Sequence, residues 1–366
     1  MGLIFISGAN ITIGGPLEIY RNVLNTLSIN YSHRKVVAIV SDTTLFLKYN
    51  NVHYIEFKNY KRFIYLKFYY EYVKYYYLSK KYNIDLWLSL NDCTPNVRAK
   101  TRAVYCHNAT PFYIRTFKDY LNPSRHFLQS FYYIFFYRIN LQYNKFVIVQ
   151  QSWIRDYFVQ KLKVPKNKLI INRFEIESSP LSFNHTLDKN NIYTFIYPTK
   201  SQSYKNIEVI LEAAEVLTNM NVLNFRILLT VKNNENLYSN NLSLKYKHLK
   251  NVYWIGFLSK PELYKLYFNS DCLIFSSKLE TWGLPISEFK NFKKPILASN
   301  LPYAHETIGD FDLCKFFNPN DAIELSNYMK KLLNNEVLQF DKSNFNSQNS
   351  NLTTNLNQLL NLLINN

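Results

Sequence analysis

Short apolar runs, each followed by polar or glycine-containing residues and then by a helical pattern, recur along the whole chain. Such runs predict strands that are buried on both faces, and their alternation with helices is typical of doubly wound parallel sheets. The predicted strands, some with the loop that follows them, cover residues 3–6, 36–40, 52–57, 86–90, 103–106, 145–152, 169–172, 193–197, 225–230, 252–259 and 272–275.

The length of the chain and a polar interruption predict two domains. At 366 residues the chain is long for one hydrophobic core and comfortable for two, and 47% of its residues are hydrophobic. Residues 173–191 are polar and contain Ser178-Ser179-Pro180, which is the composition of a linker between domains. We therefore expect one domain over residues 1–172, a second over 173–345, and a C-terminal helix over 346–366.

A glycine turn between two glutamates follows the predicted strand 272–275. Gly283 permits a tight turn, and Pro285 is compatible with the first turn of a helix. Free N–H groups at a helix N-terminus suit a phosphate or a sugar oxygen. Glu280 and Glu288 lie on either side of this turn and can accept hydrogen bonds from vicinal hydroxyls. Taken alone, the two carboxylates also fit a capped surface helix with a glutamate facing water.

The same stretch resembles the donor-site motif of retaining glycosyltransferases of family 4. In that family two glutamates separated by seven residues enclose Gly-Leu-Pro, as Glu280 and Glu288 do here. The resemblance continues through residues 294–303, Glu306 and Gly309-Asp310. It implies a GT-B fold, in which two Rossmann-like doubly wound domains face each other across a cleft. The first domain would bind the acceptor, the second would bind the donor, and the C-terminal helix would return to the first domain.

The resemblance also implies how the donor diphosphate is bound. The family has an arginine after the strand that corresponds to residues 193–197 and a lysine before the next helix. Lys205 matches the lysine, whereas no arginine is present, so that Thr199 or Lys200 must take its place. An ammonium group neutralises phosphate but lacks the bidentate geometry of a guanidinium.

Further donor contacts follow from the same resemblance. The backbone of residues 282–284 and Glu280 would hold the donor sugar, Glu288 would accept from the ribose, and Gly256 with Phe257 would contact the base. Together the expected donor-binding residues are Gly14, Gly15, Thr199, Lys200, Lys205, Gly256, Phe257, Trp282, Gly283, Leu284 and Glu288.

Two segments of the first domain are expected to face a ligand. Gly14-Gly15 does not form the GxGxxG pattern of dinucleotide-binding proteins. It resembles the glycine loop of family 4 enzymes, which approaches the donor phosphates and the acceptor, although paired glycines more often form an ordinary turn. His107 lies at the carboxyl end of the strand 103–106, where functional residues of parallel sheets collect. Its His-Asn-x-x-Pro-Phe run also resembles the family, so we expect His107, Lys205 and Glu280 to be catalytic; a capping or core histidine is the alternative.

The formal net charge of +17 is concentrated in the first half of the chain. Residues 1–172 contain 24 Lys and Arg against 8 Asp and Glu, a net charge of +16, whereas residues 173–366 contain 19 against 18, a net charge of +1. Nucleic acid, an anionic bilayer and a pyrophosphate-bearing substrate are the physical candidates for partners. A general bias of the source proteome toward Asn, Lys and Tyr would explain part of the excess without a function.

Residues 60–82 alternate aromatic and basic side chains. At helical spacing this pattern predicts a helix with one apolar face and one cationic, tyrosine-rich face, which suits a membrane interface. A long core helix with a solvated back is the alternative. Residues 112–143 repeat the composition, with residues 131–137 as their most apolar part.

Four scattered cysteines without a Cys/His cluster favour a reducing cytoplasm and argue against a zinc site. We expect no metal and no cofactor besides the co-substrate. The apolar N-terminus lacks the basic start of a signal peptide, and no run is long enough to span a bilayer. We expect a cytoplasmic protein that is peripheral at the inner face of the plasma membrane.

The function implied by the resemblance is transfer of a hexosyl or deoxyhexosyl group (EC 2.4) with retention of configuration and without a metal. A nucleotide sugar, with UDP, GDP or dTDP as its carrier, would be the donor. The basic first domain favours a lipid-pyrophosphate-linked glycan as the acceptor and bacterial O-antigen or capsule synthesis as the setting. A nucleotide-sugar 2-epimerase of the same fold is one alternative. A non-catalytic nucleic-acid-binding protein is another, although no nucleic-acid-binding motif accompanies the charge.

Overall fold

The computed structural model describes residues 2–58, 60, 63–112, 125–173, 192–343, 352–353 and 355–365. The chain forms two compact units. The first unit consists of Met1–Glu175 with Gln348–Asn366, and the second consists of Ile176–Ser347. Residues 174–191 of the predicted linker and the polar residues 344–351 lie outside the described part.

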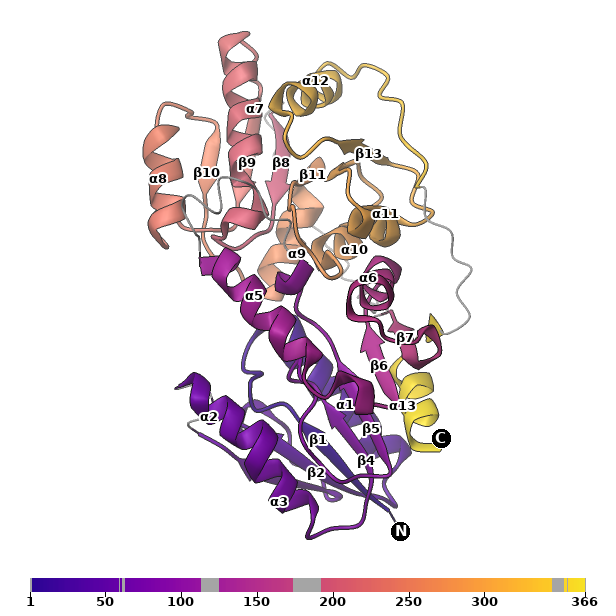
Figure 1. Ribbon diagram of the computed structural model, residues 1–366. Coiled ribbons are helices and arrows are strands. Elements are labelled where there is room, and N and C mark those ends of the chain that lie inside the picture. Colours follow the sequence, from indigo (N-terminus) through magenta and orange to yellow (C-terminus); the bar gives the residue numbers. More distant parts are fainter. Residues whose placement is uncertain are drawn as a thin grey trace. The chain divides into compact units, whose positions relative to one another are not determined.

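The first unit contains a parallel sheet. Its strands are β1 Leu3–Ser7, β2 Lys35–Val40, β3 Val52–Glu56, β4 Ile84–Ser89, β5 Thr101–Tyr105, β6 Phe146–Val149, β7 Leu169–Asn172 and β14 Leu352–Thr353. Among the described residues their order is β14-β7-β6-β5-β4-β1-β2-β3 (Figure 1). The chain runs outward from β1 to β3 and resumes at β4 on the other side of β1. The topological switch point, where ligands of such sheets bind, therefore lies between β1 and β4.

The helices of the first unit cover both faces of this sheet. They are α1 Gly14–Asn30, α2 Ile64–Phe68, the π-helix η2 Tyr69–Lys74, α3 Tyr75–Ser79, α5 Arg125–Arg138, α6 Ser152–Leu162 and α13 Leu356–Asn365. Short 3-10 turns occur at η1 Thr43–Leu45, η3 Thr110–Phe112, η4 Leu141–Tyr143 and η5 Lys166–Lys168.

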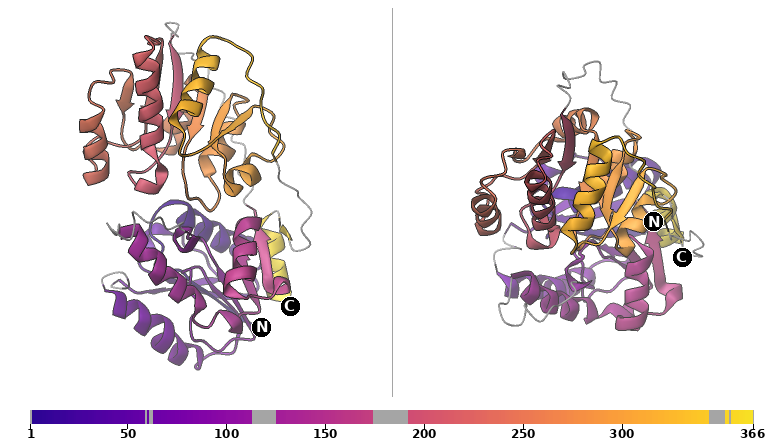
Figure 2. Two further views of the ribbon diagram at one scale, coloured as in Figure 1. Left: turned by 45° about the horizontal axis from the view of Figure 1, so that its top comes forward. Right: turned by 90° about the horizontal axis from the view of Figure 1, so that it is seen from above.

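Successive side chains of a strand point to opposite faces of the sheet, so the apolar strands contribute to two cores, one on each face. Ile4 and Ile6 of β1 belong to the core that α1 and α13 cover, whereas Phe5 packs against Trp87 in the core on the side of α3. The apolar stripe of α13 is fully buried in the first core, and α13 packs against α1. Figure 2 shows this C-terminal helix, in yellow, beside the first unit.

The segment between β3 and β4 is helical as predicted, but the predicted cationic face needs a correction. Lys67 is buried, with its ammonium nitrogen 4.7 Å from the centroid of the Phe136 ring on α5. Glu71, in the π-helix, is also fully buried and accepts hydrogen bonds from Tyr60 and Asn91. Lys67 therefore does not belong to the cationic face predicted for residues 60–82, because aromatic rings of α5 cover its side chain.

The second unit repeats the architecture with a smaller sheet. Its strands are β8 Tyr193–Tyr197, β9 Phe225–Leu229, β10 Val252–Trp254, β11 Cys272–Phe275, β12 Ile296–Ser299 and β13 Cys314–Phe317. They pair in parallel in the order β10-β9-β8-β11-β12-β13, so the switch point of this sheet lies between β8 and β11. Its helices are α7 Ile207–Asn219, α8 Leu237–Lys245, α9 Lys260–Asn269, α10 Leu284–Lys290, α11 Pro302–Ile308 and α12 Ala322–Leu333, with the 3-10 turn η6 Ser203–Lys205 before α7.

Within the described ranges, no helix combines the length and the hydropathy that crossing a bilayer requires.

Candidate functional site

Lys205 lies in a loop whose backbone is held at the switch point of the second sheet. The loop follows β8, and the Tyr197 hydroxyl at the end of that strand donates to the Lys205 carbonyl oxygen at 2.7 Å. Ser276, which follows β11, donates to the carbonyl oxygen of Asn206 at 2.9 Å. Asn206 has a left-handed backbone (φ 55°), and its side-chain amide donates to the carbonyl oxygen of Pro319 at 2.7 Å. These hydrogen bonds hold the backbone of residues 205 and 206 in place, and with it the point from which the Lys205 side chain extends.

The Lys205 ammonium contacts the Glu280 carboxylate, which arrives from the loop after β11. Both side chains are mostly buried. Burial alone would lower the pKa of Lys205, but the Glu280 carboxylate and the hydroxyls of Tyr197 and Tyr204 outweigh burial and raise it. Lys205 is therefore charged at neutral pH. The resemblance implied separate roles for Lys205 and Glu280, and the structure brings the two side chains into direct contact.

The glycine turn is packed into the second unit. Gly283 has φ 82°, a left-handed backbone that favours glycine, whereas a Cβ atom there would make only ordinary contacts, 3.4 Å from Ile286 and 3.6 Å from the Phe275 ring. The indole N–H of Trp282 donates to the Ser287 hydroxyl at 2.9 Å. The Thr307 hydroxyl of α11 donates to the Trp282 carbonyl oxygen. Leu284 begins α10 and is exposed.

Glu288 lies apart from the Lys205–Glu280 pair, against α9. Its Oε2 atom accepts a hydrogen bond from the Tyr267 hydroxyl at 3.1 Å. Burial raises the pKa of Glu288, whereas the Tyr267 hydrogen bond and the nearby Lys260 oppose the shift. Its other oxygen makes no hydrogen bond to the part of the chain that the structure describes, so it is available to a ligand hydroxyl.

Gly256 and Phe257 follow β10, at the same edge of the sheet. Gly256 has φ 80°, and its N–H donates to the carbonyl oxygen of Val231 at 3.2 Å, so this N–H is already engaged. The Phe257 side chain is 86% exposed. An exposed ring of this size can stack on a flat ligand.

Thr199 and Lys200, the expected substitutes for the family arginine, differ in their surroundings. The Thr199 N–H donates a hydrogen bond to the hydroxyl oxygen of Thr230, the residue after β9, at 2.8 Å. Lys200 is exposed, and its ammonium makes no hydrogen bond or ion pair with other described residues. Lys290 and Lys294 are engaged instead at helix ends, where they donate to the carbonyl oxygens of Ile308, the last residue of α11, and of Ser270, the residue after α9.

The expected residues of the first unit lie at the carboxyl edge of its own sheet. Gly14 has φ 73° and begins α1, with Gly15 next to it. His107 is buried and stacks on Tyr105 at 4.5 Å, and neither ring nitrogen has a hydrogen-bond partner in the described ranges. Burial lowers the pKa of His107, despite the opposing Asp92 carboxylate, so the ring is neutral at neutral pH. Its predicted catalytic role stays a prediction.

Sequence analysis missed Asp92, which organises the loop that holds His107. Asp92 has φ 59°, and its carboxylate accepts from the N–H of His107 at 2.5 Å and of Asn108 at 3.0 Å, and from the Tyr137 hydroxyl at 3.0 Å. The available signal was the polar pair Asn91-Asp92 directly after the apolar run 86–90, because polar residues at strand carboxyl ends collect at such sites.

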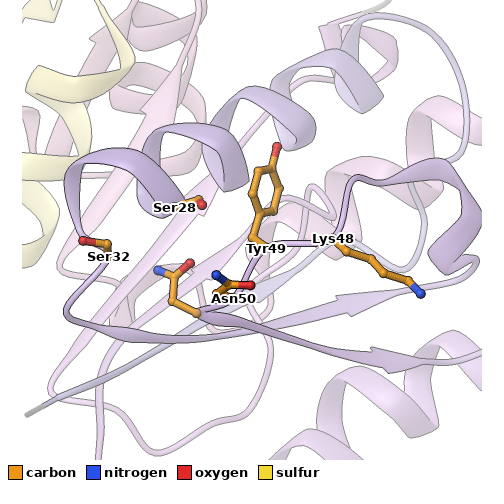
Figure 3. A pocket seen from close by; sticks show the side chains of 6 residues that line it. Ser28, Ser32, Lys48, Tyr49 and Asn50 are labelled. Carbon is orange, nitrogen blue, oxygen red and sulfur yellow. The ribbon is translucent and has the colours of Figure 1, made fainter.

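A shallow pocket of about 300 Å³ in the first unit lies away from these residues (Figure 3). Its lining residues precede β2 and β3, so it is at the amino edge of the sheet, opposite His107. They are Ser28, Ser32, Lys48, Tyr49, Asn50 and Asn51. We assign no function to this pocket.

Comparisons with known proteins bear on the fold and on the second unit. Residues 181–350 match the family described as glycosyl transferases group 1. A glycosyltransferase from Rickettsia africae ESF-5 is 17% identical over 91% of this chain and 88% of that chain, with a TM-score of 0.63. The lipopolysaccharide outer core galactosyltransferase WaaB is 12% identical over 93% and 92%, with a TM-score of 0.63. Anabaena Alr3699/HepE in complex with UDP is 15% identical over 92% and 90%, with a TM-score of 0.60.

A comparison with curated protein sequences gave no match. The structural likenesses and the two parallel-sheet Rossmann-like units confirm the predicted GT-B fold. The family match covers the unit that holds Lys205, Glu280 and Glu288, so it is this unit that resembles the family.

Proposed function

We propose that this chain is a retaining, metal-independent glycosyltransferase that moves a sugar from a nucleotide sugar to a glycan acceptor. The acceptor is a lipid-pyrophosphate-linked glycan of bacterial O-antigen or capsule synthesis, at the inner face of the plasma membrane. The observation that carries the proposal is the Lys205–Glu280 contact beside the β8/β11 switch point, within the residues that match the family.

Two of the similar structures support the choice of donor and setting. Alr3699/HepE was crystallised with UDP and with UDP-glucose. WaaB is described as a lipopolysaccharide outer core galactosyltransferase. A nucleotide sugar and a surface glycan are therefore the substrates to test first.

The residues of the second unit suit a donor that is bound by its diphosphate, sugar and ribose. The Lys205 ammonium, with Lys200, neutralises the diphosphate, and Glu280 with the backbone of residues 282–284 holds sugar hydroxyls. Glu288 accepts from the ribose through its oxygen that Tyr267 leaves unbonded. Phe257 stacks on the base. Because Glu280 contacts Lys205 in the free protein, the arriving diphosphate shares or replaces that contact.

The proposed transfer is a front-face displacement. The bond between the sugar C1 atom and the diphosphate oxygen breaks, and its electron pair stays with the diphosphate. The acceptor hydroxyl forms the new C1–O bond on the same face, and its proton passes to the departing phosphate oxygen. The products are the extended glycan and a nucleoside diphosphate. Lys205 stabilises the charge that grows on the leaving group.

Thermal-shift measurements with UDP, GDP, dTDP and their sugars test the donor site. We expect one base to be preferred. At about 100 times its dissociation constant, the preferred nucleotide should stabilise the folded protein by roughly 2.7 kcal/mol, which a thermal shift detects. At equal concentration, the preferred nucleotide should raise the unfolding temperature of the Glu288→Ala variant less than that of the wild type. A chain that no nucleotide stabilises at millimolar concentration would contradict the proposal.

Transfer is expected to persist in EDTA. No group of three or more His, Cys, Asp and Glu that could hold a metal occurs among the described residues. We propose that Lys205 and Lys200 neutralise the diphosphate without a metal. Activity is measured as nucleoside diphosphate release before and after chelation, with magnesium or manganese added back. Abolition by EDTA with rescue by manganese would show that a metal takes part.

A further inference from the structure

The helical segment between β3 and β4 presents a continuous stripe of exposed aromatic and apolar side chains. Tyr65, Tyr69, Val73 and Tyr77 recur every four residues, and their exposed fractions lie between 42% and 61%. Residues four apart lie on one face of a helix. Side chains of this size are usually covered in a folded protein, so this face is suited to contact a partner.

Helix α5 runs beside α2 and carries a second exposed stripe. Leu128, Phe131 and Phe135 have exposed fractions between 46% and 58%. The two helices are packed together, since the ring centroids of Phe68 on α2 and Phe136 on α5 are 4.6 Å apart (Figure 1). We call the two stripes together the aromatic surface.

The helices that carry the aromatic surface, and the residues directly after them, also carry exposed basic side chains. Lys74, Lys80, Lys81 and Arg138 are exposed. The Lys80 ammonium lies 4.5 Å from the centroid of the Tyr76 ring. Residues 63–82 and 125–143 contain a single acidic side chain, Glu71, and it is fully buried. No described carboxylate of these segments therefore faces solvent to oppose an anionic partner.

Buried polar groups hold this surface in place. Glu71 accepts hydrogen bonds from Tyr60 and from Asn91, which follows β4. Lys67 inserts between the two helices, over the rings of α5. The exposed rings therefore project from helices that are anchored to the sheet. Binding of a partner then costs little conformational entropy in these helices.

We propose that the aromatic surface docks on the anionic face of a phospholipid bilayer. Tyrosine and phenylalanine rings partition to the headgroup level, and lysines beside them reach the lipid phosphates while their alkyl stems stay in apolar surroundings. The +16 net charge of residues 1–172, against +1 for the rest, fits an anionic surface that faces this unit only. The inference stands on this surface and does not depend on the proposed transfer reaction.

Sedimentation with phosphatidylglycerol/phosphatidylcholine vesicles tests the charge component. The test variant carries Lys74→Glu, Lys80→Glu and Lys81→Glu, and the matched control carries Lys245→Glu, Lys247→Glu and Lys250→Glu, which are exposed residues of the second unit. Lys67 is left unchanged because it is buried. Both variants have the same net charge. We expect the first to bind at least about tenfold more weakly than the wild type and the control to bind like the wild type.

The aromatic component is tested at high salt, where exposed charges are screened. The wild type should keep a salt-resistant fraction on vesicles at about 0.5 M salt. Tyr65→Ser, Tyr69→Ser and Tyr77→Ser together should remove that fraction, whereas Leu237→Ser, Leu244→Ser and Val337→Ser, exposed apolar residues of the second unit, should not. Unchanged thermal unfolding of each variant checks that it is folded.

Three outcomes would overturn the proposal. The wild type could remain in the supernatant at low salt, or the two charge-reversed variants could bind vesicles equally. The tyrosine variant could also lose a concentration-dependent dimer, or binding to RNA, while vesicle binding is unchanged. None of these measurements uses a nucleotide sugar, so a failed docking and a failed transfer reaction are distinguishable.

Discussion

Lys205→Ala is expected to lower the turnover number at least about tenfold, which corresponds to roughly 1.4 kcal/mol of activation free energy. The Lys205 ammonium is mostly buried and is held charged by Glu280, so it can stabilise a leaving diphosphate more strongly than an exposed lysine can. Turnover is measured as nucleoside diphosphate release at saturating donor. Lys200→Ala, which changes an exposed lysine of the same loop, should have the smaller effect.

The pairing of Lys205 with Glu280 supplies a second control. Glu280→Gln removes the carboxylate that contacts Lys205 and leaves the ammonium free for the diphosphate. We expect this variant to bind the free nucleoside diphosphate at least as well as the wild type while its turnover with intact sugars falls. If turnover of Lys205→Ala stays within twofold of the wild type, another cation carries the diphosphate and the assignment is wrong.

Glu288→Ala is expected to weaken binding of the free nucleoside diphosphate by roughly 1.5–3 kcal/mol, or about 10- to 100-fold, because the ribose loses a charged acceptor. Tyr267 holds one oxygen of Glu288 and leaves the other available. Tyr267→Phe removes only the hydrogen bond that orients the carboxylate, so its effect should be smaller. Binding is measured by calorimetric titration.

The raised pKa of Glu288 adds a pH dependence to this prediction. The carboxylate takes up a proton at a higher pH than an ordinary glutamate, because burial disfavours its charged form. Nucleotide affinity of the wild type should therefore fall as the pH is lowered through this raised pKa, and that fall should be absent in Glu288→Ala. Equal affinity of the wild type and Glu288→Ala at neutral pH would remove Glu288 from the donor site.

Elements with strong local patterns could be predicted from the sequence. Most buried strands of both sheets are short apolar runs that the sequence predicts, although β12 and β13 are absent from the predicted strands. Helix α9 begins with the Ser259–Glu262 capping box and a proline at Pro261. Helix α8 was missed because its residues are mostly polar and lack an apolar period. It begins instead at a reciprocal cap between Asn236 and Ser239, which only the structure makes evident.

Contacts between residues far apart in the chain could not be predicted. Lys205 and Glu280 are 75 residues apart, and they meet because β8 and β11 are neighbours at the switch point. Lys67 looked like a surface lysine because its neighbours are basic and aromatic, yet α5, more than 50 residues later, covers it. Local composition indicates that a helix is amphipathic, but the packing partner decides which of its polar groups are buried.

The most direct test of the donor site and its chemistry is a transfer assay with the full chain. A labelled nucleotide sugar, chosen by its thermal shift, is incubated with vesicles that carry a lipid-pyrophosphate-linked glycan, and the product linkage is determined by NMR. The proposed function predicts that label moves to the glycan with its anomeric configuration retained, one nucleoside diphosphate is released for each linkage formed, and Lys205→Ala slows both. A nucleotide sugar that binds but is never consumed, or that is epimerised while the glycan stays unlabelled, would contradict it.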